Sequence, residues 1–225
     1  MAWEQSNLKL YILIPHLGSV TVEWCKMFFC DLIKPPNTRW LFGRGAPIDV
    51  TREMLVEDAL KNNASLIAFI DSDVVPDHPD ALIKLIRYYY ALRNRGVNVG
   101  VISGLYWAKK PNPVLCAFRK VKGGYAPIAP KQPSNIVEVD VVGLGFSIVN
   151  PDVFSMPKPW FLWTQGRKYL AEKLGEDIGE MSEDFYFCEK IRKHGWKVLV
   201  CLDVKCAHIG MIRINSDGTV SSMRV

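Results

Sequence analysis

A short run in the first third of the chain, residues 67–73, most constrains how it can fold. Four apolar residues lead directly into Asp71, Ser72 and Asp73. The apolar residues predict a buried strand, and side chains two apart on a strand face the same way. Two carboxylates at a strand end repel each other unless a cation or hydrogen-bond donors compensate, and Mg²⁺ or Mn²⁺ prefers such oxygen ligands. The run therefore predicts a strand that ends in a metal site, with a solvated acidic turn as the alternative.

The residues around this run alternate between strand and helix patterns. Apolar runs predict strands at 8–14, 39–42, 66–70 and 97–103. Amphipathic patterns predict a helix at 20–32, a second capped by Asp49, and a third capped by Asp77. Strands that alternate with helices of ten or more residues are typical of a mostly parallel α/β sheet flanked by helices on both faces.

The pattern changes after Gly104. Runs on either side of Gly123-Gly124 predict a smaller antiparallel hairpin portion. Further strands are predicted at 137–142, 146–149 and 197–202, and helices at 167–174 and from Ser182 to His194. We expect a single domain over residues 1–210 and a C-terminal tail over 211–225 that forms a loose hairpin.

Composition narrows the function classes. The 225 residues carry 28 basic and 23 acidic side chains, a net charge of +5 that suits a phosphorylated substrate or an anionic membrane surface but not a nucleic-acid partner. No apolar run is long enough to span a membrane, and the polar N-terminus lacks a signal-peptide pattern. We therefore expect a cytoplasmic protein, with peripheral membrane contact left open.

The six cysteines form no C-x-x-C pair and sit mostly in apolar runs. Buried free thiols are the expected state. The alternative is a zinc site built from Cys201, Cys206 and His208, although this spacing matches no familiar zinc motif.

Several polar residues fall at predicted strand ends or helix starts. Ligands of doubly wound sheets bind beyond the carboxyl ends of the strands, where Pro15 and Asp71 are expected. Arg52, in the first turn of its helix, would lie near this edge and could pair with a phosphate or a base; the alternative is a solvated surface arginine. His208 follows a strong strand and is a candidate third metal ligand beside Asp71 and Asp73.

An acidic pair follows Ser182. Acidic residues in a first helical turn suit the helix dipole, which is a structural explanation for Glu183 and Asp184. An acid held at a helix start beside a substrate can also act as a general base. The sequence leaves both roles open.

Taken together, these residues resemble the nucleotide-sugar-dependent glycosyltransferases of the GT-A fold, particularly the family 2-like group. The resemblance covers nearly the whole chain and rests on segments in family order: 11–15, 49–56, 69–73, 141–148, 182–188 and 207–210. It implies a Rossmann-like GT-A domain that moves a sugar from a nucleoside-diphosphate sugar to an acceptor hydroxyl on a sugar, lipid or protein. The donor sugar, the acceptor, the stereochemical outcome and the oligomeric state are not decided by the sequence.

The resemblance also implies roles for individual residues. Mn²⁺ or Mg²⁺ is expected to bind through Asp73 and His208, with Asp71 nearby. Asp184 is the expected base if the reaction inverts configuration, with Glu183 the second candidate. The donor-binding residues expected are Pro15, Arg52, Asp71, Ser72 and Asp73. The acceptor side is expected to include Gly143 and Gly145, together with Trp160 and Trp163.

The two tryptophans belong to a proline- and aromatic-rich segment, residues 157–163. Aromatic faces stack on sugar rings, so we expect this segment to form an acceptor-site lid that orders when donor binds. Its alternative is a buried loop that covers the sheet.

Three other functions remain as alternatives. Residues 71–75 also fit the nucleophile motif of haloacid-dehalogenase-like phosphatases, but three strands precede them where that family usually has one. A sugar nucleotidyltransferase should carry a glycine-rich basic loop after its first strand, which residues 15–18 do not supply. A non-enzymatic carbohydrate-binding protein would have no need for Asp71, Asp73, Asp184 and His208 on one edge.

Overall fold

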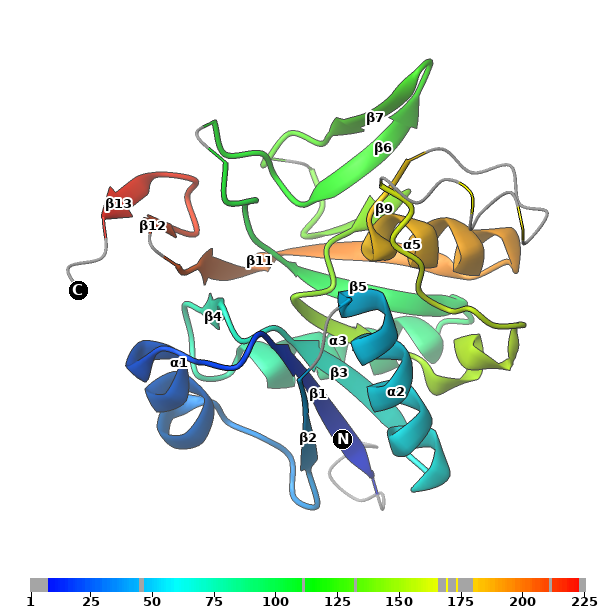
Figure 1. Cartoon of the computed structure of the whole chain (residues 1–225), viewed down its shortest axis with the longest axis horizontal. Coiled ribbons are helices and arrows are strands. Elements are labelled where there is room, and N and C mark those ends of the chain that lie inside the picture. The colour runs from blue at the N-terminus through cyan, green and yellow to red at the C-terminus, as the bar shows by residue number, and fades with distance from the viewer. Residues whose placement is uncertain are drawn as a thin grey trace.

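The computed structural model describes residues 8–44, 47–110, 112–131, 133–165, 169, 173, 180–210 and 212–222. Within these residues, ten strands form one large sheet and three form a small one (Figure 1). The main path of the large sheet runs β13-β12-β11-β5-β10-β3-β1-β2. Its strands are β1 (Leu10–His16), β2 (Arg39–Arg44), β3 (Leu66–Ile70), β5 (Val99–Leu105), β10 (Phe146–Val149), β11 (Lys197–His208), β12 (Ile212–Ile214) and β13 (Val220–Ser222).

Two short strands, β4 (Val74–Pro76) and β8 (Ile136–Val139), pair with β11 beside this path. The small antiparallel sheet contains β7 (Gly124–Pro127), β6 (Ala117–Val121) and β9 (Val141–Val142). Its β6–β7 hairpin projects from the rest of the molecule in Figure 1. The predicted strand over 137–142 is thus two strands, because β8 joins the large sheet and β9 joins the hairpin.

Strand direction in the centre of the sheet follows the α/β pattern with one exception. β1 pairs in parallel with β2 and β3, and β11 pairs in parallel with β5. β10 lies between β3 and β5 and runs antiparallel to both. The sheet is therefore mostly parallel at its centre, with helices on both faces.

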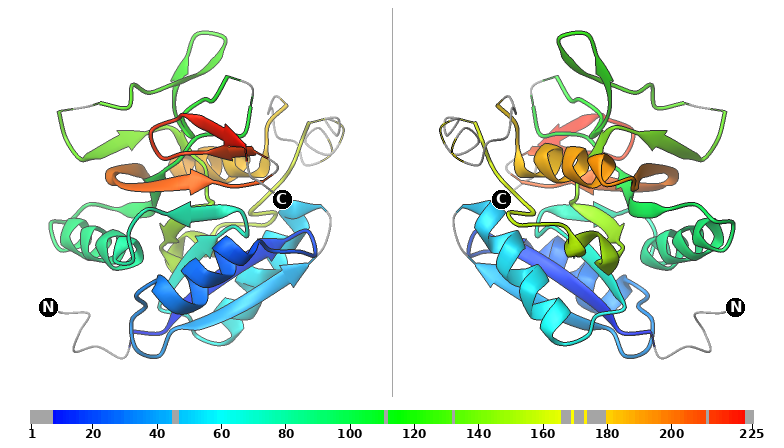
Figure 2. Two further views of the ribbon diagram at one scale, coloured as in Figure 1. Left: turned by 90° about the vertical axis from the view of Figure 1, so that its left-hand side faces the viewer. Right: turned by 90° about the vertical axis from the view of Figure 1, so that its right-hand side faces the viewer.

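The helices are α1 (Val22–Lys26) continued by a π-helical turn (Met27–Asp31), α2 (Ile48–Lys61), α3 (Ala81–Arg93), a 3₁₀ turn (Pro151–Ser155) and α5 (Glu183–Lys193). β1 shows how they divide between the two faces. Tyr11 and Leu13 belong to the apolar cluster under α2 and α5, whereas Leu10, Ile12 and Ile14 belong to the cluster under α1 and α3. One view in Figure 2 has α1 in front and the other has α2 and α5.

Two of the predicted helix caps are wrong. α2 has Pro47 at its N-cap position, and Asp49 lies inside the first turn, where its Oδ2 accepts a hydrogen bond from Trp163 N at 2.9 Å. α3 has Asp80 rather than Asp77 at its N-cap position. Ser182 does occupy the N-cap position of α5, but its side chain makes no capping hydrogen bond.

The described part of the predicted tail forms the hairpin β12–β13, and β12 pairs with the end of β11. The domain boundary after residue 210 stays a prediction. Most of the predicted helix at 167–174 lies outside the described residues. Among the helices described, none combines the length and the hydropathy needed to cross a membrane.

Candidate functional site

A cleft of about 1130 Å³ lies where α2, the end of β3, the β6–β7 hairpin and the start of α5 meet. Pockets for small ligands usually enclose about 300–1,000 Å³, so this one has room for more than one small molecule. A buried cluster of charged side chains lines one end, and aromatic side chains line the other. The cleft lies beyond the carboxyl end of β3, where ligands of α/β sheets are expected.

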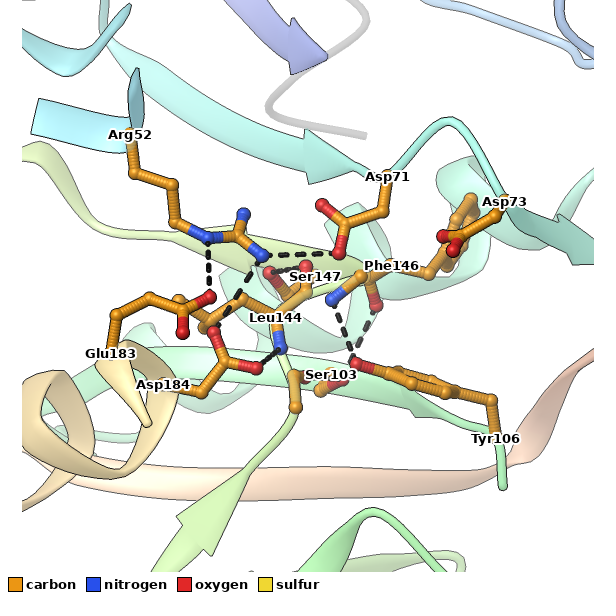
Figure 3. Close-up of polar contacts among 12 residues, drawn as sticks. Arg52, Asp71, Asp73, Ser103, Tyr106, Leu144, Phe146, Ser147, Glu183 and Asp184 are labelled. Atoms are coloured by element: carbon orange, nitrogen blue, oxygen red, sulfur yellow. Dashed lines mark hydrogen bonds and ion pairs between the residues drawn. The ribbon is translucent and has the colours of Figure 1, made fainter. Parts of the chain in front are cut away.

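The charged end is organised around Arg52, which is only 1% exposed (Figure 3). Its Nη2 lies 3.0 Å from Asp71 Oδ2 and 3.6 Å from Asp184 Oδ1, and its Nε lies 3.3 Å from Glu183 Oε1. The guanidinium also lies over the Phe69 ring, 4.9 Å from its centroid. One buried cation thus holds three carboxylates from the end of β3 and the start of α5.

Three carboxylates and one guanidinium leave an excess of negative charge in a buried place. Burial raises the pKa values of Asp71 and Glu183, although Arg52 opposes the shift. Burial, and next the charge of Glu183, raise the pKa of Asp184 well above the usual aspartate range. Burial thus disfavours the charged form of all three carboxylates, against the opposing charge of Arg52.

The cluster also has unused hydrogen-bonding capacity. Among the described residues, Arg52 Nη1, Asp71 Oδ1 and Asp184 Oδ1 are buried and have no hydrogen-bond partner. A buried polar atom without a partner costs about 1–3 kcal/mol. These atoms belong to residues that line the cleft but are themselves shielded from solvent.

The turn at 143–145 fixes the second oxygen of Asp184. Leu144 N donates a hydrogen bond to Asp184 Oδ2 at 3.2 Å, and Gly145 N donates to the Tyr106 hydroxyl at 2.9 Å. A Cβ at Gly143 would collide with the Tyr106 hydroxyl, and one at Gly145 would lie 2.9 Å from Val74 Cγ2. Both glycines permit close packing here, but only Gly143 is among the residues that line the cleft.

Asp73 and His208 form a second polar group. The Asp73 Oδ2 atom lies 3.4 Å from His208 Nε2 and 2.5 Å from Lys109 Nζ. His208 Nδ1 lies 2.9 Å from the Trp107 carbonyl oxygen, a partner that requires Nδ1 to donate and so leaves Nε2 to face Asp73. Burial opposes ionisation of Asp73, but His208 and Lys109 outweigh it and lower its pKa to about 2.

The expected triad of metal ligands, Asp71, Asp73 and His208, does not converge. β3 ends at Ile70, and residues 71–73 form a turn in which Val74 N donates to Asp71 O at 3.1 Å. Strand alternation therefore stops before the two carboxylates, and Asp71 faces Arg52 while Asp73 faces His208. Within the described ranges, no three His, Cys, Asp or Glu side chains are grouped to hold a metal ion, which also rules out the cysteine–histidine zinc cluster there.

Asp73 and His208 alone retain the chemistry of a metal-binding pair. A carboxylate oxygen and an imidazole nitrogen face each other, and a backbone carbonyl orients the imidazole from behind. Metal-binding histidines are commonly oriented in this way. Two of the three expected ligands thus lie close together, in an arrangement that a divalent-ion site could use.

The remaining predicted residues divide into those at the cleft and those away from it. Trp163 lines the cleft. Pro15 is paired with Gly43 between β1 and β2, and neither it nor Ser72 is among the lining residues. Trp160, expected at the acceptor side, does not line the cleft. It is 6% exposed and packs edge-on against Phe154, with ring centroids 5.0 Å apart.

The predicted lid, residues 157–163, is also buried in part. Phe161 and Leu162 are buried like Trp160, and Glu53 Oε2 accepts hydrogen bonds from the backbone N of Trp160 and Phe161 at 3.0 and 3.3 Å. This part of the segment is core, as in the alternative of a buried loop.

Sequence reasoning missed the aromatic end of the cleft. Phe185 of α5 lies with its ring centroid 5.0 Å from those of both Phe118 and Tyr125 of the hairpin. Lys120 Nζ lies beside them, 3.3 Å from Glu189 Oε2. The residues were visible as hairpin aromatics, but their contact with α5 depends on the fold.

Comparisons with known proteins address the fold. No protein-family model matches the sequence, and neither does any curated protein. The structure is similar to "A197 from STIV", with a TM-score of 0.68 and 19% identity over 96% of this chain and 95% of that one. It is also similar to "GalNAc-T7 with UDP, GalNAc and Mn²⁺", with a TM-score of 0.52 and 10% identity over 92% of this chain and 44% of that one.

A third structure, a CMP:2-keto-3-deoxy-manno-octonic acid synthetase with CTP, has a TM-score of only 0.38 and carries no argument. At these identities the first two similarities show the fold alone. They confirm the predicted class, a Rossmann-like GT-A arrangement of a mostly parallel sheet, flanking helices and a smaller antiparallel portion.

Proposed function

We propose that this protein is a glycosyltransferase that moves a sugar from a nucleoside-diphosphate sugar to an acceptor hydroxyl. The observation that carries the proposal is the cleft itself. Buried carboxylates from the end of β3 and the start of α5 line it, on a fold shared with GalNAc-T7, whose structure holds UDP, GalNAc and Mn²⁺. This combination favours nucleotide-sugar chemistry over a binding function, which has no need for a buried cluster of carboxylates.

We assign the donor to the charged end of the cleft. Asp73 and His208 would hold Mn²⁺ or Mg²⁺, which when bound supplies positive charge to a diphosphate leaving group. Arg52 holds Asp71 and the acidic pair in place and is proposed to act on the donor through them, because its own Nη1 is buried. Pro15 and Ser72, away from the cleft wall, would contribute only through the backbone around them.

Asp184 is the proposed general base. Leu144 N holds its Oδ2, and the side chain is 19% exposed, so the carboxylate could accept the proton of an acceptor hydroxyl. Its raised pKa brings its basicity closer to neutral pH, where a general base is most effective. Glu183 suits this role less well, because its Oε1 is paired with Arg52 Nε and its side chain is almost fully buried.

We assign the acceptor to the other end of the cleft. Gly143 and Trp163 remain proposed acceptor-side residues, and Phe118, Tyr125 and Phe185 join them. Aromatic faces can stack on the rings of a sugar acceptor. Gly145 supports this side from behind the wall, and Trp160 is no longer proposed for it.

A donor screen tests the proposal. The protein is incubated with Mn²⁺ and a panel of nucleotide sugars, and release of each nucleoside diphosphate is measured. Release from one donor that is lost in Asp184→Asn is the expected result. Release of phosphate from a generic phosphoester, with no nucleoside diphosphate from any sugar donor, would instead support a phosphatase.

A further inference from the structure

We infer that Lys109 is a resident cation of the Asp73–His208 pair, and that a divalent ion binds Asp73 only after the Lys109 ammonium has left it. The inference rests on the proposed function in one respect, the assignment of this pair to a metal. It goes further by naming a residue that no part of the sequence pattern singled out.

The position of Lys109 is defined from two sides. Its Nζ lies 2.5 Å from Asp73 Oδ2 and donates a second hydrogen bond to the Ile209 carbonyl oxygen at 3.1 Å. Ile209 N in turn donates to Asp73 O at 2.7 Å, so the two acceptors are fixed relative to each other. The ammonium is therefore held by two oxygens, in an ion pair whose side chains are partly exposed, at 29% and 39%.

The same place calls for a cation on chemical grounds. Asp73 Oδ2 lies 3.4 Å from His208 Nε2 and 2.5 Å from Lys109 Nζ. A carboxylate is stabilised by positive charge at contact distance. Lys109 supplies that charge in the ligand-free protein.

A divalent ion and the ammonium compete for this oxygen. Mg²⁺ binds its oxygen ligands at about 2.0–2.1 Å, so an ion on Asp73 Oδ2 would stand close to an ammonium at hydrogen-bond distance from the same atom. The two cations repel, which favours movement of Lys109 out of the pair. Lys109 lines the cleft on a flexible stem, so the phosphates of a bound donor are within the space that it can enter.

The neighbouring Lys110 provides a matched comparison. It lines the same cleft, and among the described ion pairs it has none with Asp73. A general loss of positive charge from the cleft should affect Mn²⁺ binding equally through either lysine. Displacement from Asp73 should depend on Lys109 alone.

The test is the affinity of the full chain for Mn²⁺ without nucleotide, measured by calorimetry and by the electron paramagnetic resonance signal of free Mn²⁺. We expect Lys109→Gln to bind Mn²⁺ at least about tenfold more tightly than the unmodified protein, because a competing charge at contact distance is gone. Lys110→Gln and the charge-conserving Lys109→Arg should stay within about twofold of the unmodified protein. Adding His208→Ala to Lys109→Gln should remove the gain.

The inference is overturned if Lys109→Gln binds no more tightly, if Lys110→Gln gains as much, or if none of the proteins binds Mn²⁺. Circular dichroism of each variant establishes that it is folded before binding is measured. The donor screen is a separate readout. A gain in Lys109→Gln with no nucleoside diphosphate released from any donor would reject the glycosyltransferase proposal and keep the role of Lys109.

Discussion

The Nε atom of Arg52 lies 3.3 Å from the Oε1 atom of Glu183, which joins α2 to α5 across 131 positions of sequence. Both side chains are almost completely buried, at 2% and 6% exposed. The Arg52 Nη2 atom also lies 3.0 Å from Asp71 Oδ2, so the same side chain joins both helices to the end of β3. The floor of the charged end of the cleft therefore depends on one residue.

Replacing Arg52 should destabilise the fold. In Arg52→Met, three carboxylates would remain buried without their cation, a loss of about 3–5 kcal/mol in the free energy of unfolding. Urea unfolding at pH 7 measures it. Lys61→Met is the control, because Lys61 makes only exposed helix pairs, and its cost should stay below about 1 kcal/mol. Equal, small losses in both variants would contradict the central role of Arg52.

The base assignment makes a kinetic prediction. Asp184→Asn keeps the shape of the side chain but cannot accept a proton, so turnover should fall about 10²–10⁴-fold. Donor affinity, measured by calorimetry, should change little. Glu180→Gln, at the same cleft, is the control and should retain turnover. Near-normal turnover in Asp184→Asn would leave Asp184 with a structural role only.

The raised pKa of Asp184 makes a prediction about pH. A base must be deprotonated, so kcat/KM should fall as pH drops through the pKa of Asp184 in the free enzyme. Because burial raises that pKa, the fall should occur clearly above about pH 4, where an ordinary aspartate titrates. A pH–rate profile measures it, and a profile flat down to pH 4 would contradict the shift.

The same pKa bears on stability, with the sign fixed by linkage. The folded state holds the Asp184 proton more tightly than the unfolded chain, so this stability is complete below the unfolded pKa and is lost as pH rises through the folded pKa. Asp184→Asn should therefore lose less stability than the unmodified protein between pH 4 and pH 8. Urea unfolding at several pH values compares the two slopes, and parallel slopes would contradict the prediction.

The two tryptophans near the cleft should behave differently. Trp160 is core, so Trp160→Ala should cost about 3–5 kcal/mol in the free energy of unfolding. Trp163 is half-buried at the cleft wall, and Trp163→Ala should cost less than half as much while weakening acceptor binding. Thermal or urea unfolding of both variants checks the order, and the reverse order would restore Trp160 as a cleft residue.

Local patterns account for the parts of the fold that the sequence predicted. The strand at 66–70 and the hairpin around Gly123-Gly124 are present as expected. Each depends on residues close in sequence, through an unbroken apolar run or a turn that glycine permits. Gly123, with φ of +89°, is such a turn residue. The cap residues were less well predicted, because Asp49 and Trp163, 114 positions apart, form a hydrogen bond that no local pattern contains.

In the candidate site, too, local sequence patterns predicted some features and tertiary packing decided the others. From the sequence alone came the acidic residues Asp71, Asp73 and Asp184 as a set of interest, since polar residues at strand ends and helix starts are a local signal. Only the tertiary structure decided which partners they have. Arg52 pairs with Asp71 across 19 positions of sequence, and Lys109 pairs with Asp73 across 36. Side-chain partners are set by packing between elements distant in the chain, and burial of the Arg52 guanidinium strengthens its pairing with Asp71.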